Sequence, residues 1–297
     1  MSGDPVPAAP PPADIPYRVP WRAAGVRIGA HRGTVEGSGG LFRDHDLLVR
    51  TKDPRRIDLR MSLRDPFENL HVKRFEQRTS VTVYALVDLS ASLGFSGSVR
   101  KIDVAADLCG AIASSARRIG DSFGMIGCNE KVVPACFWPA TTSRGAEAEM
   151  VASLRGFSPA DQGTLGRGAH GLIDAAAFIA GRRKLVFLIS DFYLPFGTIE
   201  AVFEALSEHD VIPIVLRDPR ELRDLPRYGL VSLADLETGK RRLYVMRPSL
   251  RRALIREEAE NAKRLRALAM RFGHPPFEVA GRVDWDRFGA YLMGEAA

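Results

Sequence analysis

The stretch Val81-Thr-Val-Tyr-Ala-Leu-Val-Asp-Leu-Ser-Ala-Ser92 decides the fold of this chain. Its first seven residues are mostly apolar and β-branched, which is typical of a buried strand. Asp88, Ser90 and Ser92 follow at alternating positions, where that strand should end. A carboxylate and two hydroxyls on such a turn offer three hard oxygens to one point, and hard oxygens suit Mg²⁺, Mn²⁺ or Ca²⁺. The stretch therefore predicts a buried strand that ends in a cation site.

Two further oxygen donors come from distant parts of the chain. Asp191 ends a second apolar run, Leu185–Ser190, and Thr164 follows Gly163 before a helix expected over 168–180. Asp, Ser and Thr are also common helix N-caps, so each of these residues has an ordinary structural explanation. The strand position and the number of donors favour the metal instead. We predict that the site consists of Asp88, Ser90, Ser92, Thr164 and Asp191, with Asp191 bound directly or through a water.

The apolar pattern of the chain alternates between strands and helices. This alternation predicts an α/β fold, with a mostly parallel sheet and helices on both faces. Ligands of such sheets bind beyond the carboxyl ends of the strands, so Asp88 and Asp191 can meet in one crevice. A hairpin over 228–233 and 242–245 is predicted at the sheet edge. Strands are predicted over 81–87, 123–128, 132–137, 185–189 and 211–216, and helices over 102–119, 146–154, 168–180, 199–206 and 250–272.

Composition divides the chain into four parts. Residues 1–20 contain seven prolines, which predicts a disordered tail. Residues 21–80 mix short apolar patches with arginines and glycines, and predict a β-rich extension that packs on the main domain. Residues 81–247 are predicted to form the α/β domain itself. Residues 248–297 predict a C-terminal helical segment, whose helix ends before Pro275.

The totals are those of an ordinary globular protein, with 297 residues, 45% hydrophobic residues and a net charge of +6. This mild excess of positive charge permits an acidic or nucleic-acid partner without demanding one. Three cysteines without a Cys-x-x-Cys pair predict buried thiols in a reducing compartment, and not a zinc site. Neither a signal peptide nor an apolar run of roughly 18 residues is seen, so we expect a cytoplasmic protein without membrane insertion.

Other chemistries have weaker signals. Ser90 stands where an aspartyl phosphatase would need its second carboxylate, and neither a Walker-type phosphate loop nor a Gly-x-Ser-x-Gly elbow occurs. The arginines between residues 55 and 74 could bind nucleic acid, but neighbouring acidic residues partly neutralise them. We therefore predict that the protein is not an enzyme. The alternatives to this prediction are a metal-dependent hydrolase that uses the same Asp/Ser/Thr cluster, a basic nucleic-acid-binding protein, and a structural domain with an empty site.

The five predicted ligands resemble the metal-ion-dependent adhesion site (MIDAS) of von Willebrand factor A modules. Upstream, Lys52-Asp-Pro-Arg-Arg-Ile-Asp-Leu-Arg60 resembles the Gly-Asp-Asp-x-Arg-x-Ile-Asp-Trp signature of one bacterial family. The segment Leu70–Glu76 resembles the Val-Lys-x-Phe-Glu segment of the same family. This is the fifty-eighth of the domain-of-unknown-function families, and it carries a von Willebrand A-like module. Lys52, Leu59 and Leu93 depart from the family pattern, and none of them is a predicted ligand.

The resemblance implies a von Willebrand A-like fold and a metal-dependent protein-interaction adaptor. Family members are commonly encoded beside MoxR-type AAA+ ATPases, so we expect such an ATPase and a client protein as partners. An Asp or Glu of the partner would complete the shell of Mg²⁺, or of Mn²⁺ or Ca²⁺. Many relatives carry an N-terminal membrane hairpin that is absent from this sequence. The shorter form is similar to MxaS-like proteins of methanol-oxidation gene clusters, which implies methanol dehydrogenase as the client.

Overall fold

The computed structural model describes residues 15–23, 28–51, 53–94, 99–158, 170–218, 228–234 and 241–295. They belong to two compact units. The first, here called the α/β unit, comprises Thr82–Arg118 and Ser122–Ala297, together with the chain up to Arg18. The second, here called the ribbon unit, comprises Val19–Val81 and Ile119–Asp121.

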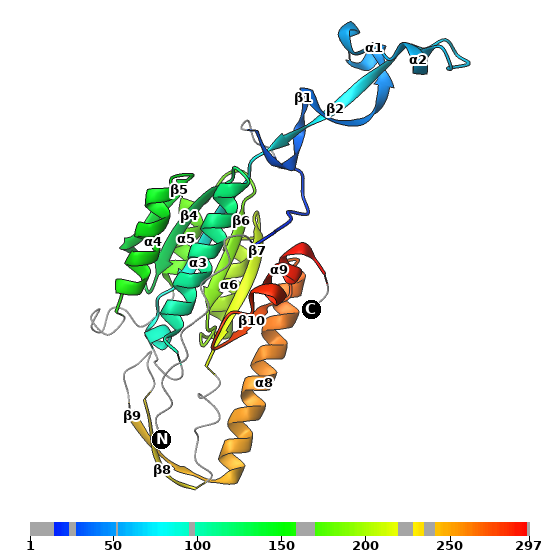
Figure 1. The fold of residues 1–297 in the computed structure, drawn as a ribbon. Coiled ribbons are helices and arrows are strands. Elements are labelled where there is room, and N and C mark those ends of the chain that lie inside the picture. The colour runs from blue at the N-terminus through cyan, green and yellow to red at the C-terminus, as the bar shows by residue number, and fades with distance from the viewer. Residues whose placement is uncertain are drawn as a thin grey trace. The chain divides into compact units, whose positions relative to one another are not determined.

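A six-stranded sheet forms the centre of the α/β unit (Figure 1). Its neighbouring strands pair in parallel, except for β4 and β5, which form an antiparallel hairpin. The predicted α/β fold with a mostly parallel sheet is therefore confirmed. In spatial order the strands are β10 (Phe277–Ala280), β7 (Asp210–Arg217), β6 (Leu185–Ser190), β3 (Thr82–Asp88), β4 (Ser122–Cys128) and β5 (Val132–Thr141).

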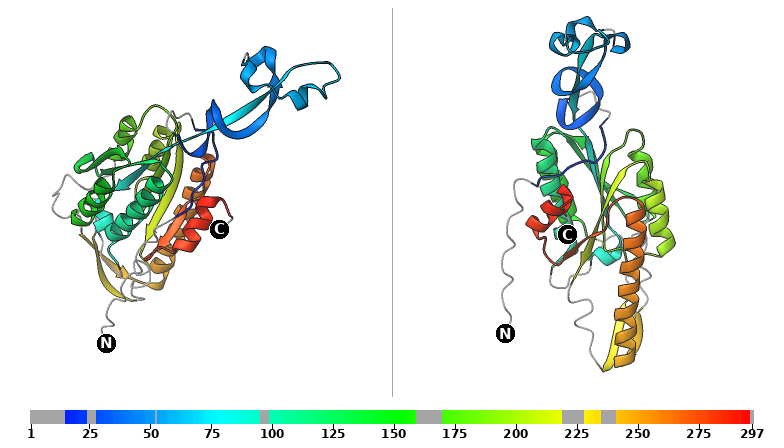
Figure 2. Two further views of the ribbon diagram at one scale, coloured as in Figure 1. Left: turned by 45° about the horizontal axis from the view of Figure 1, so that its top comes forward. Right: turned by 90° about the vertical axis from the view of Figure 1, so that its right-hand side faces the viewer.

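Helices cover both faces of this sheet (Figures 1 and 2). The central strands require this cover, because every residue of β6 and every residue of β3 after Thr82 is buried. Leu86 and Leu188 pack in the core below α5, α6 and α8, whereas Phe187 faces α9, its ring centroid 6.4 Å from that of Phe288. One face carries α3 (Lys101–Arg118), α4 (Arg144–Gly156) and α9 (Trp285–Met293), and the other carries α5 (Gly171–Phe178), α6 (Phe196–Ala205) and α8 (Pro248–Arg271).

The C-terminal segment differs from the helical segment predicted over 248–297. After α8 the chain adds the strand β10, parallel to β7, and then α9. Phe277 and Val279 of β10 are buried, and the rings of Phe277 and Phe288 lie 4.9 Å apart. A four-residue strand has too few alternations for its period to be recognised in a sequence. The main sheet therefore extends past the predicted boundary at residue 247.

Two smaller predictions also need correction. The hairpin of β8 (Gly229–Ala234) and β9 (Arg241–Met246) exists, but as a separate two-stranded sheet and not at the edge of the main one. The predicted disordered tail over 1–20 does not hold for its last residues. Ile15 is buried, and its N–H donates to Ser115 Oγ at 2.7 Å, because this segment supplies an apolar side chain to the α/β unit. Residues 1–14 lie outside the described residues.

The ribbon unit is built on one antiparallel pair, β1 (Ile28–Leu47) and β2 (His71–Thr79). These strands are much longer than the short apolar patches seen in the sequence, because glycines and charged residues interrupt the apolar alternation of β1. The segment belongs to a compact unit of its own, where we expected an extension packed on the main domain. The short helices α1 (Leu48–Thr51), η1 (Pro54–Arg56) and α2 (Leu59–Ser62) connect the two strands, with α1 and α2 at one end of the ribbon (Figure 1).

Within the described residues, no helix has both the length and the apolar character that crossing a membrane requires. Cys109, Cys128 and Cys136 are free and buried, as predicted. Burial raises the pKa of all three thiols, so they stay protonated at neutral pH.

Candidate metal centre

The carboxyl ends of β3 and β6 bring the predicted residues together. Asp88 is the last residue of β3, and Asp191 directly follows β6. The two strands are parallel neighbours in the sheet, with Val87 paired to Ile189. Their carboxyl ends therefore lie at the same sheet edge, which is where ligands of parallel sheets bind. Ser90 and Ser92 enter this edge from the turn that leads into the short 3-10 helix η2 (Ala91–Gly94).

Hydrogen bonds link these side chains into one buried cluster. Ser90 Oγ and Ser92 Oγ lie 3.1 Å apart, and Ser92 Oγ donates to Asp191 Oδ1 at 3.1 Å. The backbone N–H of Ser90 donates to Asp88 Oδ1 at 2.9 Å. All four side chains are buried. Four of the five predicted residues therefore converge, and the fifth, Thr164, lies outside the described residues.

Ser190 is a member of the cluster that sequence reasoning missed. Its hydroxyl donates to Asp88 Oδ2 at 2.5 Å and accepts the N–H of Phe192 at 2.8 Å. Phe192 has a φ of 54°, an unusual backbone conformation for a bulky residue. This turn lets the N–H of Tyr193 donate to Asp191 Oδ1 at 3.2 Å, so the loop after β6 orients both carboxylates.

Lys101 is the second residue that sequence reasoning missed. Its ammonium donates to Asp191 Oδ2 at 2.9 Å, although the side chain is only 2% exposed. A signal was present in the sequence, because Lys101 continues the apolar stripe of Ala105, Leu108 and Ile112 at helical spacing. Burying a lysine costs free energy unless a negative charge accompanies it. Lys101 therefore places a basic group against one of the two carboxylates.

The carboxylates of Asp88 and Asp191 repel each other. Burial, followed by the nearby charge of Asp191, raises the pKa of Asp88 to about 6. Hydrogen bonds from Ser190 and Ser90 act in the opposite direction and favour the ionised carboxylate. The ammonium of Lys101 pairs with Asp191 alone among the two carboxylates, so a further positive charge would relieve the repulsion that remains between them.

The donor set fits a hard dication. Within the described part of the chain, no group of three or more His, Cys, Asp or Glu side chains is placed to hold a metal. The cluster instead offers two carboxylates and serine hydroxyls, an all-oxygen set that suits Mg²⁺, Mn²⁺ or Ca²⁺ and not the softer metals. Asp88, Ser90, Ser92 and Asp191 are the described residues that could bind such an ion.

Comparison with protein families matches residues 51–264 to the family described as "Protein of unknown function DUF58". Two relatives are informative. The chain is 29% identical over 266 residues to the uncharacterized protein Rv1480 of Mycobacterium tuberculosis (strain ATCC 25618 / H37Rv), a match covering 88% of this chain and 81% of the relative. It is 36% identical over 99 residues to an uncharacterized protein in the moxR 3' region of Paracoccus denitrificans, covering 33% of this chain and 92% of that protein.

The solved structures that are similar to this chain include the following two proteins. The conserved hypothetical protein BatB from Bacteroides thetaiotaomicron has a TM-score of 0.43 and 15% identity, over 72% of this chain and 97% of BatB. Proximal thread matrix protein 1 of the mussel byssus, in a structure with a zinc-occupied MIDAS motif, has a TM-score of 0.35 and 16% identity. That match covers 46% of this chain and 38% of the mussel protein.

Proposed function

The chain belongs to the DUF58 family of proteins of unknown function, and on this premise we propose that it is a metal-dependent adaptor for protein–protein interaction that works with a MoxR-type AAA+ ATPase. The observation that carries this proposal is the buried oxygen cluster of Asp88, Ser90, Ser92 and Asp191. The relative encoded in a moxR 3' region supports the choice of ATPase.

Bound Mg²⁺ would supply one electrophilic position for the carboxylate of a partner protein. Asp88, Ser90, Ser92 and Thr164 would hold the ion, and Asp191 would bind it directly or through a water. Lys101 sets the charge balance of this arrangement. With two carboxylates and one ammonium, the cluster carries a single net negative charge, so a dication leaves a single positive charge. A partner Asp or Glu neutralises that charge, and for this reason metal and partner should bind cooperatively.

The adaptor would couple ATP-driven remodelling by the ATPase to the assembly, or metal loading, of a client protein. We propose methanol dehydrogenase as the client, on the basis of the resemblance to MxaS-like proteins. No catalytic role is assigned to the cluster in this proposal, because its side chains act as ligands and hydrogen-bond partners. Retention of methanol dehydrogenase by the immobilised adaptor and ATPase, in the presence of ATP, tests this client.

The first test is calorimetric titration of chelator-stripped protein with Mg²⁺, Mn²⁺ and Ca²⁺, followed by binding to a MoxR-type ATPase from the same genome. We expect one saturable metal site that Asp88→Ala abolishes, together with ATPase binding, while the circular dichroism spectrum stays native. Asp286→Ala removes an exposed carboxylate from α9 and is the matched control, with both kinds of binding unchanged. An EDTA-insensitive complex that forms equally well with Asp88→Ala would refute the proposal.

A further inference from the structure

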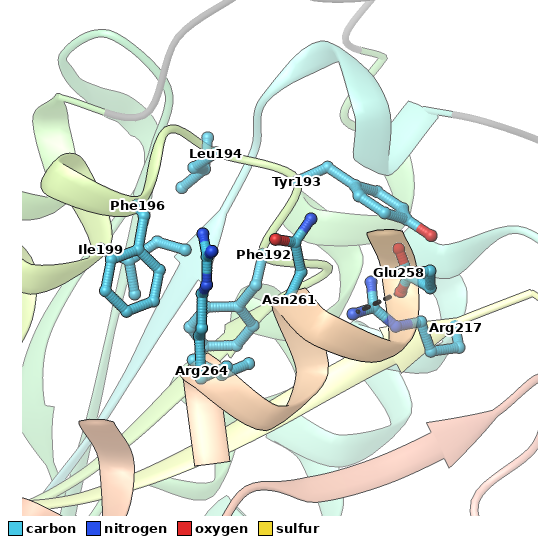
Figure 3. A pocket seen from close by; sticks show the side chains of 10 residues that line it. Phe192, Tyr193, Leu194, Phe196, Ile199, Arg217, Glu258, Asn261 and Arg264 are labelled. Carbon is cyan, nitrogen blue, oxygen red and sulfur yellow. Dashed lines mark ion pairs between the residues drawn. The ribbon is translucent and has the colours of Figure 1, made fainter. Parts of the chain in front are cut away.

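A pocket of about 420 Å³ lies beside the buried oxygen cluster. It is lined by the loop after β6, the start of α6, the end of β7 and one side of α8 (Figure 3). Phe192, Phe196 and Leu265 are among its apolar lining residues. The volume is at the lower end of the range of ligand-binding pockets, which is sufficient for one large apolar side chain.

A residue that lines the pocket, Arg217, also contacts the buried oxygen cluster. Arg217, at the end of β7, donates to the backbone oxygen of Asp191 at 2.5 Å and pairs with Glu258 of α8 at 3.0 Å. The guanidinium of Arg217 also lies 4.7 Å from the ring centroid of Tyr193, whose N–H donates to Asp191. A segment of a partner protein that binds the cluster with one side chain can therefore place a side chain from a nearby position of the same segment in the pocket.

The rim of the pocket on α8 is positively charged. Glu258, Asn261 and Arg264 follow each other at intervals of three residues, which places them on one side of α8 that faces the pocket (Figure 3). The charge of Glu258 is compensated by Arg217. Arg264 is exposed and forms no ion pair with a described residue. An apolar pocket with a free guanidinium at its rim is complementary to an apolar side chain that is followed or preceded by a carboxylate.

We propose that this pocket is a second recognition site for the partner, and that its occupant is an acidic segment of a partner protein. In this arrangement a large apolar side chain enters the pocket, one carboxylate of the segment reaches the metal, and a second carboxylate pairs with Arg264. The inference rests on the proposed function, because it assumes that a partner carboxylate completes the metal site.

The experiment selects binders for the immobilised full-length protein from a random peptide library in the presence of Mg²⁺. The expected peptides carry Asp or Glu within a few residues of Leu, Ile, Met, Phe or Trp. Recovery of no peptide, or of peptides without acidic residues, would overturn the inference. A Mg²⁺-dependent association of the protein with itself, measured by analytical ultracentrifugation, would also overturn it, since the occupant would then be a second copy.

Charge reversal at one helix position then locates the binding. Arg264→Glu should weaken the binding of a selected peptide by at least about tenfold, because it replaces an attraction to the peptide carboxylate by repulsion between like charges. Arg266→Glu is the matched control, because Arg266 is also exposed on α8 but does not line the pocket. Both variants should bind Mg²⁺ like the wild type. Equal peptide binding by the two variants, with EDTA sensitivity retained, refutes the pocket and leaves the metal adaptor standing. Peptides that bind equally in EDTA refute the adaptor.

Discussion

The candidate metal site of the α/β unit buries charged side chains, whereas the helical end of the ribbon unit exposes apolar ones. In the α/β unit, Asp88 and Asp191 are 0% exposed and Lys101 is 2% exposed. At the helical end of the ribbon, Leu63 is 86% exposed and Phe67 is 83% exposed. Both regions depart from the usual division of polar surface and apolar core, but only the buried charges are tied to partners inside the fold.

Mutations in the two regions therefore change different properties of the protein. Removal of a charge from the buried cluster leaves its partner without compensation, so the stability of the fold must change. Removal of an exposed leucine or phenylalanine from the ribbon end changes what the surface offers to other molecules.

The largest expected effect separates a buried ion pair from an exposed one. Asp191→Ala removes the carboxylate that faces the buried ammonium of Lys101, and should lower the free energy of unfolding by about 3–5 kcal/mol. Arg56→Ala breaks the partly exposed pair with Asp53 in the ribbon unit, and should cost no more than about 1 kcal/mol. Urea unfolding of both variants in metal-free buffer measures the difference. Similar losses would contradict the contrast between the buried pair and the exposed pair.

Metal binding should stabilise the α/β unit by an amount that the cluster controls. At a free Mg²⁺ concentration of about 100 times Kd, linkage predicts a gain of about 2.7 kcal/mol in the free energy of unfolding. Asp88→Ala should lose this gain because it lacks a ligand. Leu63→Ser, in the ribbon unit, should retain all of it. Chemical unfolding with and without Mg²⁺ gives the result, and an equal gain in Asp88→Ala would place the metal elsewhere.

Lys101 should weaken the binding of metal by wild-type protein. Lys101→Met removes the ammonium that competes for Asp191, and should tighten Mg²⁺ binding by about tenfold, or about 1.4 kcal/mol. Partner binding should then depend less on an acidic residue, because the metal-loaded site becomes neutral. Calorimetry with Mg²⁺ measures the first effect. Weaker binding in Lys101→Met would show instead that Lys101 orients Asp191 for the metal.

The smallest effect concerns an aspartate of the ribbon unit, whose pKa shifts in the direction opposite to that of Asp88. A hydrogen bond from His45, at 3.0 Å, is the main cause that lowers the pKa of Asp58 to about 2. Because the folded pKa is depressed, this stabilisation is complete above the usual value of 3.8 and is lost as pH falls through about 2. NMR titration of the carboxyl carbon should show this midpoint. His45→Ala should raise it, and an unchanged midpoint would exclude the hydrogen bond as the cause.

The sequence predicted those features of the fold and the site that short-range patterns encode. Alternating apolar runs identified the central strands and the mostly parallel sheet, and the position of Asp88 and Asp191 after their strands identified the shared edge. Thr164 stays a prediction. The strand β10 was missed because four residues carry too weak a period. Ser190 and Lys101 were missed as site residues because one completes an apolar strand and the other continues an apolar helical stripe.

By itself, the sequence determined which side chains can donate hard oxygens and that a parallel sheet would carry them, because period and spacing are local properties of the chain. Tertiary structure alone decided which of these groups meet. The adjacency of β3 and β6 joins Asp88 to Ser190, the start of α3 delivers Lys101 to Asp191, and the packing of α8 closes the pocket. These contacts join residues far apart in the chain, and their geometry depends on strand order and helix packing, which no local pattern encodes.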